Sequence, residues 1–207
     1  AKIPEGGDIA RTLGNGCVHA GKELGVTHVA AVKGQGLPAY DPRAVKGIGV
    51  TYATSPMGAD HTAGYAVATN ILKVGGYVHP LKAEQQCPLS QGLQEATAVF
   101  DSAGLCVFLA FACLDQPDSL AAIPEMISAR YGVDFGLDQF GAYGAKVLET
   151  ERGFNRKAGF TPAHDRLPAF FSQEPLPPHN VVWDVADEDL NAVCGWSPVT
   201  ELSEGNK

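Results

Sequence analysis

Apolar residues recur at helical spacing along most of this chain. Between residues 81 and 100, Leu89, Leu93, Ala96 and Phe100 follow one another at steps of three or four residues, which places them on one face of a helix. Weaker patterns of the same kind predict helices over residues 8–24, 43–54, 106–114, 119–131, 137–156 and 187–196. The chain is therefore expected to be mostly helical.

The helix over residues 137–156 has the clearest division between two faces. We expect its apolar stripe to consist of Phe140, Tyr143, Val147 and Leu148. Glu149, Glu151 and Arg152 should then face water. The run of apolar residues from 107 to 112 has no polar face, so we expect the helix that contains it to be buried.

Glycine and proline separate these helices. The chain contains 24 glycines and 14 prolines, which is a high count for a helical protein and indicates many turns. Residues 33–42 hold two prolines and two glycines and should form an extended loop, and residues 161–180 hold five prolines. We predict an all-α, multihelical fold with long ordered loops rich in proline and glycine, and a domain boundary near residues 30–42.

The composition excludes several classes of protein. The formal net charge is −8, and no basic patch is visible, so a nucleic-acid partner is not expected. The longest apolar run, residues 105–114, falls well short of the roughly 20 residues that cross a bilayer, so no membrane association is expected either. The first residues show no signal-peptide pattern, and we expect a cytoplasmic protein.

Cysteine usage argues against a disulfide framework. The five cysteines form an odd and widely spaced set, and no CxxC or CxxxC pair occurs. The chain therefore lacks the local motif that commonly builds a four-thiolate metal site. Any metal cluster bound by one of these thiols would need ligands from elsewhere.

The turn at residues 101–106 places a carboxylate and a thiol at the start of the apolar run. One interpretation is that Asp101 and Cys106 hold a ligand. The other is that Asp101 caps a helix through backbone N–H groups and Cys106 is an ordinary core residue. Cys113, on roughly the same helical face, is expected to be structural.

A second polar site lies in the glycine-flanked turn at residues 58–64, where Asp60 and His61 are adjacent. Such a loop can present an imidazole to a cavity. A single loop histidine is, however, more often a surface residue, and the residues alone leave both interpretations open.

Taken together, four segments resemble the C-terminal part of the aldehyde ferredoxin oxidoreductase family, the tungsten-pterin enzymes. Residues 32–43 resemble the VKG…PAYDPR segment of that family, and residues 52–61 resemble its YATS-x-x-GADH turn. Residues 101–106 match its DxxGLC motif, and residues 154–168 resemble its FN-x-x-x-GF…D-x-LP stretch. The four motifs keep the family's order over nearly the whole chain. The resemblance assigns residues 1–30 to the end of the middle helical domain and residues 31–207 to the C-terminal helical domain, or all 207 residues to one continuous unit.

The resemblance implies a role for each candidate residue. Asp101 would hydrogen-bond the pterin, with Leu105 and Val107 packed on it, and Cys106 would be one ligand of a [4Fe–4S] cluster. His61 would lie beside the tungsten or molybdenum and move protons or orient the substrate. The implied reaction oxidises an aldehyde to a carboxylic acid and passes electrons through the cluster to ferredoxin.

The resemblance also implies what the chain needs in addition. At Met57 and Ala63, well-known members carry basic residues that help to anchor the pterin, so other anchors are expected. The family's N-terminal cofactor-binding portion is a required partner, and we expect the isolated chain to be inactive and to bind no tungstopterin or [4Fe–4S] cluster. The alternative is a stand-alone helical module for binding or assembly that has lost catalysis.

Overall fold

The structure is a computed structural model that describes residue 4 and residues 6–196. Its longer helices are α3 (Lys46–Thr54), α4 (Gln86–Ser102), α5 (Val107–Asp115), α6 (Pro117–Tyr131) and α7 (Leu137–Lys157). The shorter elements are α1 (Asp8–Gly14), α2 (Cys17–Leu24), α8 (Phe170–Gln173), α9 (Asp187–Cys194), the one-turn segments η2 (Thr62–Gly64) and η4 (Pro162–His164), and the π-helical η3 (Ala68–Leu72). The expected helical fold is confirmed.

A small hairpin opens the segment that follows the first two helices. Strands β1 (Ala31–Val32) and β2 (Gln35–Gly36) pair antiparallel across a two-residue turn. Both turn residues have positive φ, 50° at Lys33 and 85° at Gly34. Two-residue hairpin turns favour this conformation because it matches the twist of the strands. The extended loop expected over residues 33–42 therefore begins with a hairpin that the sequence analysis did not predict.

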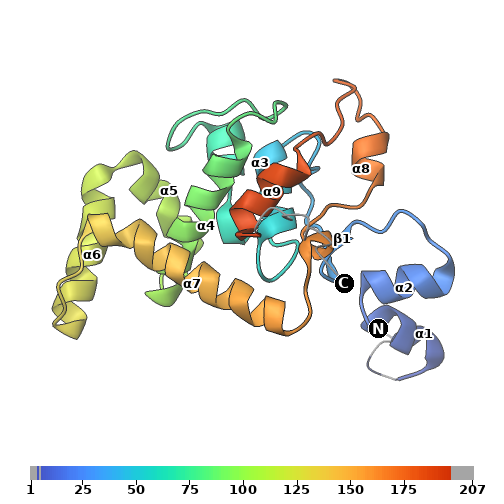
Figure 1. Ribbon diagram of the computed structural model, residues 1–207, viewed down its shortest axis with the longest axis horizontal. Coiled ribbons are helices and arrows are strands. Elements are labelled where there is room, and N and C mark those ends of the chain that lie inside the picture. Colours follow the sequence, from blue (N-terminus) through green and yellow to red (C-terminus); the bar gives the residue numbers. More distant parts are fainter. Residues whose placement is uncertain (1–3, 5, 197–207) are drawn as a thin grey trace, which may run out of the picture.

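The main core surrounds α3, whose nine residues are all buried. A helix buried on every side has no solvent-facing polar stripe, which agrees with the two glycines and four β-branched residues of α3 and with its lack of an exposed polar face. Residues from β1, α8 and α9 and from the loop around Trp183 complete this cluster. Helices α4 and α9 both pack against α3 and against each other, and Figure 1 shows the three near the middle of the molecule.

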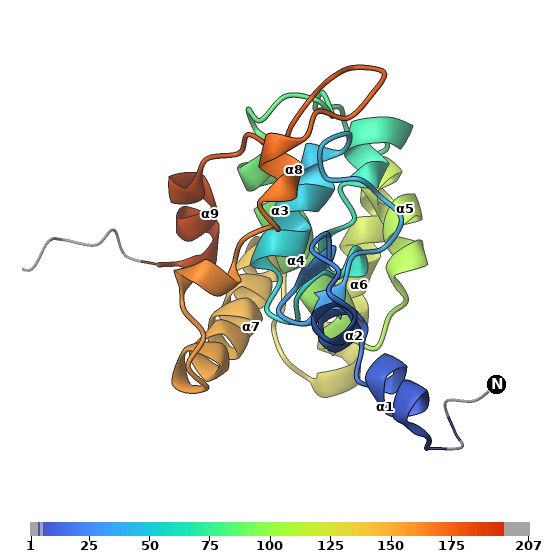
Figure 2. The ribbon, with the colours of Figure 1, turned by 90° about the vertical axis from the view of Figure 1, so that its right-hand side faces the viewer.

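A second, smaller core lies where α4, α5, α6 and α7 meet. Its buried members are Val99, Phe100, Cys113, Ile123 and Phe140. Figure 1 shows α5 and α6 at one end of the molecule and α1 and α2 at the other, with α7 running beside α4. Figure 2, turned by 90°, shows α1 projecting away from the main body.

Helices α4 and α7 cross closely at Gly144. A Cβ atom at this position would lie 1.9 Å from the Glu95 carbonyl oxygen. The apolar stripe of α7 differs from the expected one for this reason: Phe140 and Leu148 are buried with Gly144 between them, while Tyr143 is 46% exposed. The expectation for Tyr143 was wrong because the contact surface is centred on a residue without a side chain.

Two further expectations were wrong. The helix over residues 8–24 is divided into α1 and α2 at Gly16, which has a φ of 90°. Helix α5 forms where expected but is not buried, since Cys113 is its one buried residue and Phe108 is 75% exposed. No helix in the described part of the chain combines the length and apolar character needed to span a membrane.

Candidate functional site

Helix α4 ends in a Schellman motif, and this motif shapes the DxxGLC segment. Gly104 adopts a φ of 72°, its N–H donates to the Asp101 carbonyl (3.0 Å), and the Leu105 N–H donates to the Phe100 carbonyl (2.9 Å). Glycine suits this left-handed position because it has no Cβ. Leu105 packs against the second core beside Phe100. The motif therefore fixes where the α4 helix stops and α5 begins.

Asp101 lies in the last turn of α4, not at the start of a helix. The hypothesis that it caps a helix was wrong, because a carboxylate here faces the negative end of the helix dipole. Burial raises the pKa of Asp101, and the nearby charge of Asp60 raises it further. None of the described residues donates a hydrogen bond to its carboxylate. A charge placed so unfavourably for stability is typical of a functional position.

Cys106 is exposed and directly precedes α5. The hypothesis that it is a core residue was therefore wrong. Cys113, seven residues further along, is buried as expected, and burial raises the pKa of its thiol. The thiol of Cys106 is thus accessible at the end of the molecule where the apolar side of α5 is also exposed.

The turn after α3 holds Asp60 and His61 through local hydrogen bonds. The Asp60 carboxylate accepts from the Thr62 N–H (2.9 Å) and the Thr62 hydroxyl (2.8 Å). Gly58 has a φ of 112°, and a Cβ there would lie 2.6 Å from the Val32 carbonyl oxygen. The turn can therefore lie this close to β1 only with glycine at position 58.

His61 is partly enclosed by aromatic rings. Its ring centroid lies 5.7 Å from those of both Tyr40 and Tyr65, and the two tyrosine hydroxyls are 2.5 Å apart. His61 Nδ1 is 3.7 Å from the Asp60 carboxylate and is buried without a hydrogen-bond partner among the described residues. His61 is therefore not an ordinary surface histidine.

Tyr65 connects His61 to α5. Its ring contacts that of Phe111 edge to face, with centroids 5.5 Å apart. Tyr65 and Val107 also line a common apolar cavity of about 150 Å³. His61 and Val107, which are 46 positions apart in the sequence, therefore both lie near the Tyr65 ring.

Lys33 ties three of the sequence motifs together. Its ammonium group donates to the carbonyl oxygens of Ala53 (2.9 Å) and Ser55 (3.0 Å) at the end of α3. It also forms a buried ion pair with Asp165, at 2.5 Å. The Lys33 ammonium group therefore connects the VKG, YATS and D-x-LP segments. The sequence analysis recognised these segments but not this connection.

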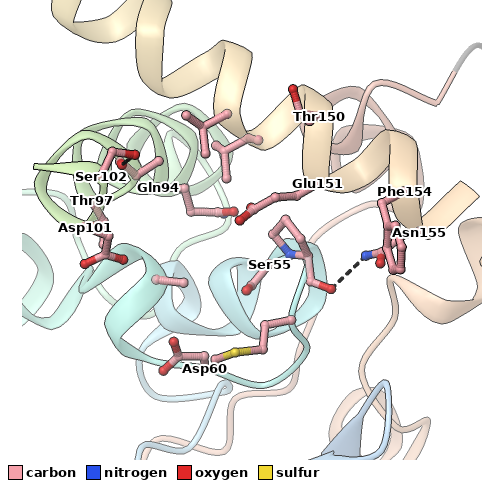
Figure 3. A pocket seen from close by; sticks show the side chains of 16 residues that line it. Ser55, Asp60, Gln94, Thr97, Asp101, Ser102, Thr150, Glu151, Phe154 and Asn155 are labelled. Atoms are coloured by element: carbon pink, nitrogen blue, oxygen red, sulfur yellow. Dashed lines mark hydrogen bonds between the residues drawn. The ribbon is translucent and has the colours of Figure 1, made fainter. Parts of the chain in front are cut away.

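A cavity of about 690 Å³ opens beside these groups. Figure 3 shows that residues of three elements face it: the turn after α3, the last turns of α4, and α7. Asn155 on α7 donates to the Pro56 carbonyl (2.7 Å), which joins the FN segment to the turn. Sixteen residues line the cavity, and they include three acidic and no basic side chains. Met57 and Ala63 are among them.

The acidic side chains are Asp60, Asp101 and Glu151. The sequence analysis placed Glu151 in water, and the residue is exposed as expected. Its side chain also lines the cavity, and in Figure 3 it extends from α7 toward Gln94 and the end of α4. The expectation was wrong for Arg152, which is partly buried and donates to the Gln94 amide oxygen at 3.5 Å. Burial raises the pKa of Glu151, Arg152 opposes this effect, and the charge of Asp101 raises it again. No signal in a single sequence reveals such a pairing across two helices.

Comparisons with known proteins match the chain along most of its length. A family model described as "Aldehyde ferredoxin oxidoreductase, domains 2 & 3" matches residues 1–200. The tungsten-containing aldehyde ferredoxin oxidoreductase of Pyrococcus horikoshii is 37% identical over 163 residues, which is 76% of this chain and 26% of that protein. The enzyme of the same name from Pyrococcus furiosus is 36% identical over 151 residues, or 70% of this chain and 24% of that protein.

The chain therefore spans about a quarter of the length of these relatives. The match to the family model includes the segments that surround the cavity in Figure 3. On this evidence, the chain belongs to the aldehyde ferredoxin oxidoreductase family.

Proposed function

We propose that this chain is the C-terminal part of a tungsten- or molybdenum-pterin enzyme that oxidises aldehydes to carboxylic acids. The observation that carries the proposal is the end of α4, where an unpaired carboxylate and an exposed thiol flank a rigid helix cap. The family membership supplies the cofactor that such groups would bind.

The residues around the cavity fit a pterin. A pterin presents an exocyclic amine and ring N–H groups, all of which are donors. The cavity offers acceptors: Asp101 lacks a donor among the described residues, and the buried Ser55 hydroxyl has no hydrogen-bond partner in the same part of the chain. Buried polar groups are normally paired, so an unpaired one in a cavity wall favours a ligand. Asp101 would accept from the pterin, and Leu105 and Val107 would pack beside it.

Cys106 would supply one thiolate to a [4Fe–4S] cluster. Exposure of its thiol suits this role, because the remaining cluster ligands must come from another part of the enzyme. When bound, the metal-pterin centre and the cluster would supply the redox chemistry of the reaction, in which an aldehyde and water give a carboxylic acid, two protons and two electrons. The electrons would pass to ferredoxin.

His61 would hold and release one of these protons. An imidazole is suited to proton transfer near neutral pH, and the Nδ1 atom of His61 lies 3.7 Å from the Asp60 carboxylate. The rings of Tyr40 and Tyr65 limit the orientations that His61 can adopt. The imidazole is therefore held in one place by packing and by a neighbouring charge.

The N-terminal portion of the enzyme would cover α5. Phe108, Leu109 and Leu114 are 75%, 42% and 37% exposed, on the most apolar helix of the chain. Apolar surface gathered on one element is typical of an interface. The greater length of the relatives supports the existence of such a covering part.

Co-expression of this chain with an N-terminal portion tests the proposal. The complex should contain tungsten or molybdenum and iron, and should reduce viologen in the presence of an aldehyde. Cys106→Ser should remove the electron paramagnetic resonance signal of the cluster, whereas His61→Ala should retain the metals and lose turnover. A complex that forms but takes up no tungsten, molybdenum or iron would refute the proposal and favour an assembly module without catalysis.

A further inference from the structure

The cavity in Figure 3 has a second carboxylate that faces it from a different helix than Asp101 does. Glu151 belongs to α7, and its side chain points across the cavity toward Gln94 and the last turns of α4. Asp101 faces the same space from α4. Two carboxylates from separate elements therefore flank one space of about 690 Å³.

The lining of this cavity contains no basic side chain to neutralise them. Arg152, next to Glu151 in the sequence, does not line the cavity; it donates to the Gln94 amide oxygen at 3.5 Å, and its charge only partly opposes the effect of burial on the pKa of Glu151. Lys33 is engaged by Asp165 and by the carbonyls at the end of α3. The charge facing the cavity is thus negative, and it is complementary to a ligand that presents hydrogen-bond donors.

A second observation points to a ligand at this place. Ser55 is fully buried, lines the cavity, and its Oγ has no partner in the described part of the chain. In Figure 3 its hydroxyl lies on the side of the turn that faces Asp60 and Asp101. The wall therefore contains a buried hydroxyl between the acidic groups, and its hydrogen-bonding capacity is unused.

Glu149 provides a matched comparison on the same helix. It lies two positions earlier on α7 and is exposed, as Glu151 is, but it pairs with Lys146 at 2.8 Å. It does not line this cavity. The two residues lie on the same helix and have the same side chain, but only Glu151 faces the cavity.

We propose that Glu151 is a second carboxylate contact for the pterin, facing Asp101 across the cavity, with the Ser55 hydroxyl as a further acceptor between them. The proposal rests on the proposed function, since it assumes the same ligand. The amine and the adjacent ring N–H of a pterin form a row of donors that matches the two oxygens of a carboxylate. Two such acceptors on opposite walls would fix the orientation of the ring as well as its position.

Binding of a soluble pterin to the co-expressed complex with the N-terminal portion, purified without its cofactor, tests this role without catalysis. The probe is 6-hydroxymethylpterin, whose fluorescence is titrated with that complex, and each variant of the chain is first checked by thermal denaturation. Glu151→Gln should raise the Kd about tenfold or more, because a charge-assisted hydrogen bond is lost. Ser55→Ala should raise it by roughly two- to tenfold, and the matched control Glu149→Gln should leave it unchanged.

The outcomes separate this inference from the proposed function. If Glu151→Gln binds the probe as tightly as the unmodified complex does while Asp101→Asn binds it more weakly, Glu151 is not a contact but the role of Asp101 stands. If the unmodified complex does not bind the probe, the inference is overturned, and the proposed function is then judged by metal uptake in the co-expressed complex. If Glu151→Gln lowers the melting temperature, Glu151→Asp is used in its place. This variant keeps the negative charge but shortens the side chain by one methylene group. An unchanged affinity of Glu151→Asp for the probe would again overturn the inference.

Discussion

Replacement of Lys33 by Met should destabilise the chain more than any other single charge removal discussed above. Lys33 and Asp165 have side chains that are only 3% and 9% exposed, so the substitution would leave a buried carboxylate without its partner cation. Two carbonyl oxygens, of Ala53 and Ser55, would lose their donor as well. Removal of one partner of a buried ion pair typically costs about 3–5 kcal/mol.

The loss is large compared with the whole stability of a domain, which is about 5–15 kcal/mol. With a urea m-value of about 2–3 kcal/mol/M, a loss of about 4 kcal/mol lowers the denaturation midpoint by about 1.3–2 M. Lys33 has a φ of 50°, and Met bears the same backbone cost there as Lys, so this cost cancels. Circular dichroism during urea titration measures the change.

Lys46→Met provides a matched control. Lys46 is also buried and also forms an ion pair at 2.5 Å, but its partner Asp184 has a side chain that is 54% exposed. Without Lys46, water can solvate the Asp184 carboxylate, so we expect a loss of about 1 kcal/mol or less. Equal losses for the two variants, or a loss under about 1 kcal/mol for Lys33→Met, would show that burial of the remaining partner does not determine the cost.

Three further predictions concern the site and its surroundings. The raised pKa of Asp101 means that the folded chain binds this proton more tightly than the unfolded chain does. Stability is therefore lost as the pH rises from 3.8, the ordinary pKa of an aspartate, through the folded pKa. Asp101→Asn should therefore stabilise the chain at pH 7, by about 0.3–1 kcal/mol from the helix dipole alone, and have no effect below about pH 3; lower stability at pH 7 would contradict this. Brief iodoacetamide treatment followed by mass spectrometry should label Cys106 and Cys17 first, because the other three thiols are partly or fully buried: Cys87, Cys113 and Cys194. Phe108→Ser should reduce binding of the dye anilinonaphthalene sulfonate to the isolated chain without lowering its melting temperature, since this ring is 75% exposed; unchanged dye binding would show that α5 is not the exposed apolar surface.

The sequence predicted best those helices whose neighbours are close in the chain. Helices α6 and α7 begin and end within two residues of the expected positions, because their apolar period is long and their ends carry clear signals. Helix α4 begins later than expected, at Gln86, where Gln85 has a left-handed φ of 66°. A helix start of this kind depends on the conformation of the preceding loop, so the spacing of apolar residues does not reveal it.

Burial was predicted less well than helix formation. The hydropathy of α5 indicates that burial of this helix is favourable, but it does not show which part of the protein covers it. Within this chain Phe108 remains exposed. The cavity could not be predicted from the sequence for a related reason. Asp101 and Glu151 lie 50 positions apart, and their common space depends on how α4 and α7 cross at Gly144. The four motifs indicated the family, but not which of their residues meet.

The Lys33 ion pair also has a consequence for the order of events during synthesis. Its partners lie 20, 22 and 132 positions further along the chain, so the turn that presents His61 stays unsupported on one side until Asp165 has left the ribosome. Contacts between distant segments form late, because the entropy of closing a long loop must be overcome first. The walls of the cavity would then be completed only near the end of translation, and a cofactor that needs those walls would enter a nearly finished polypeptide.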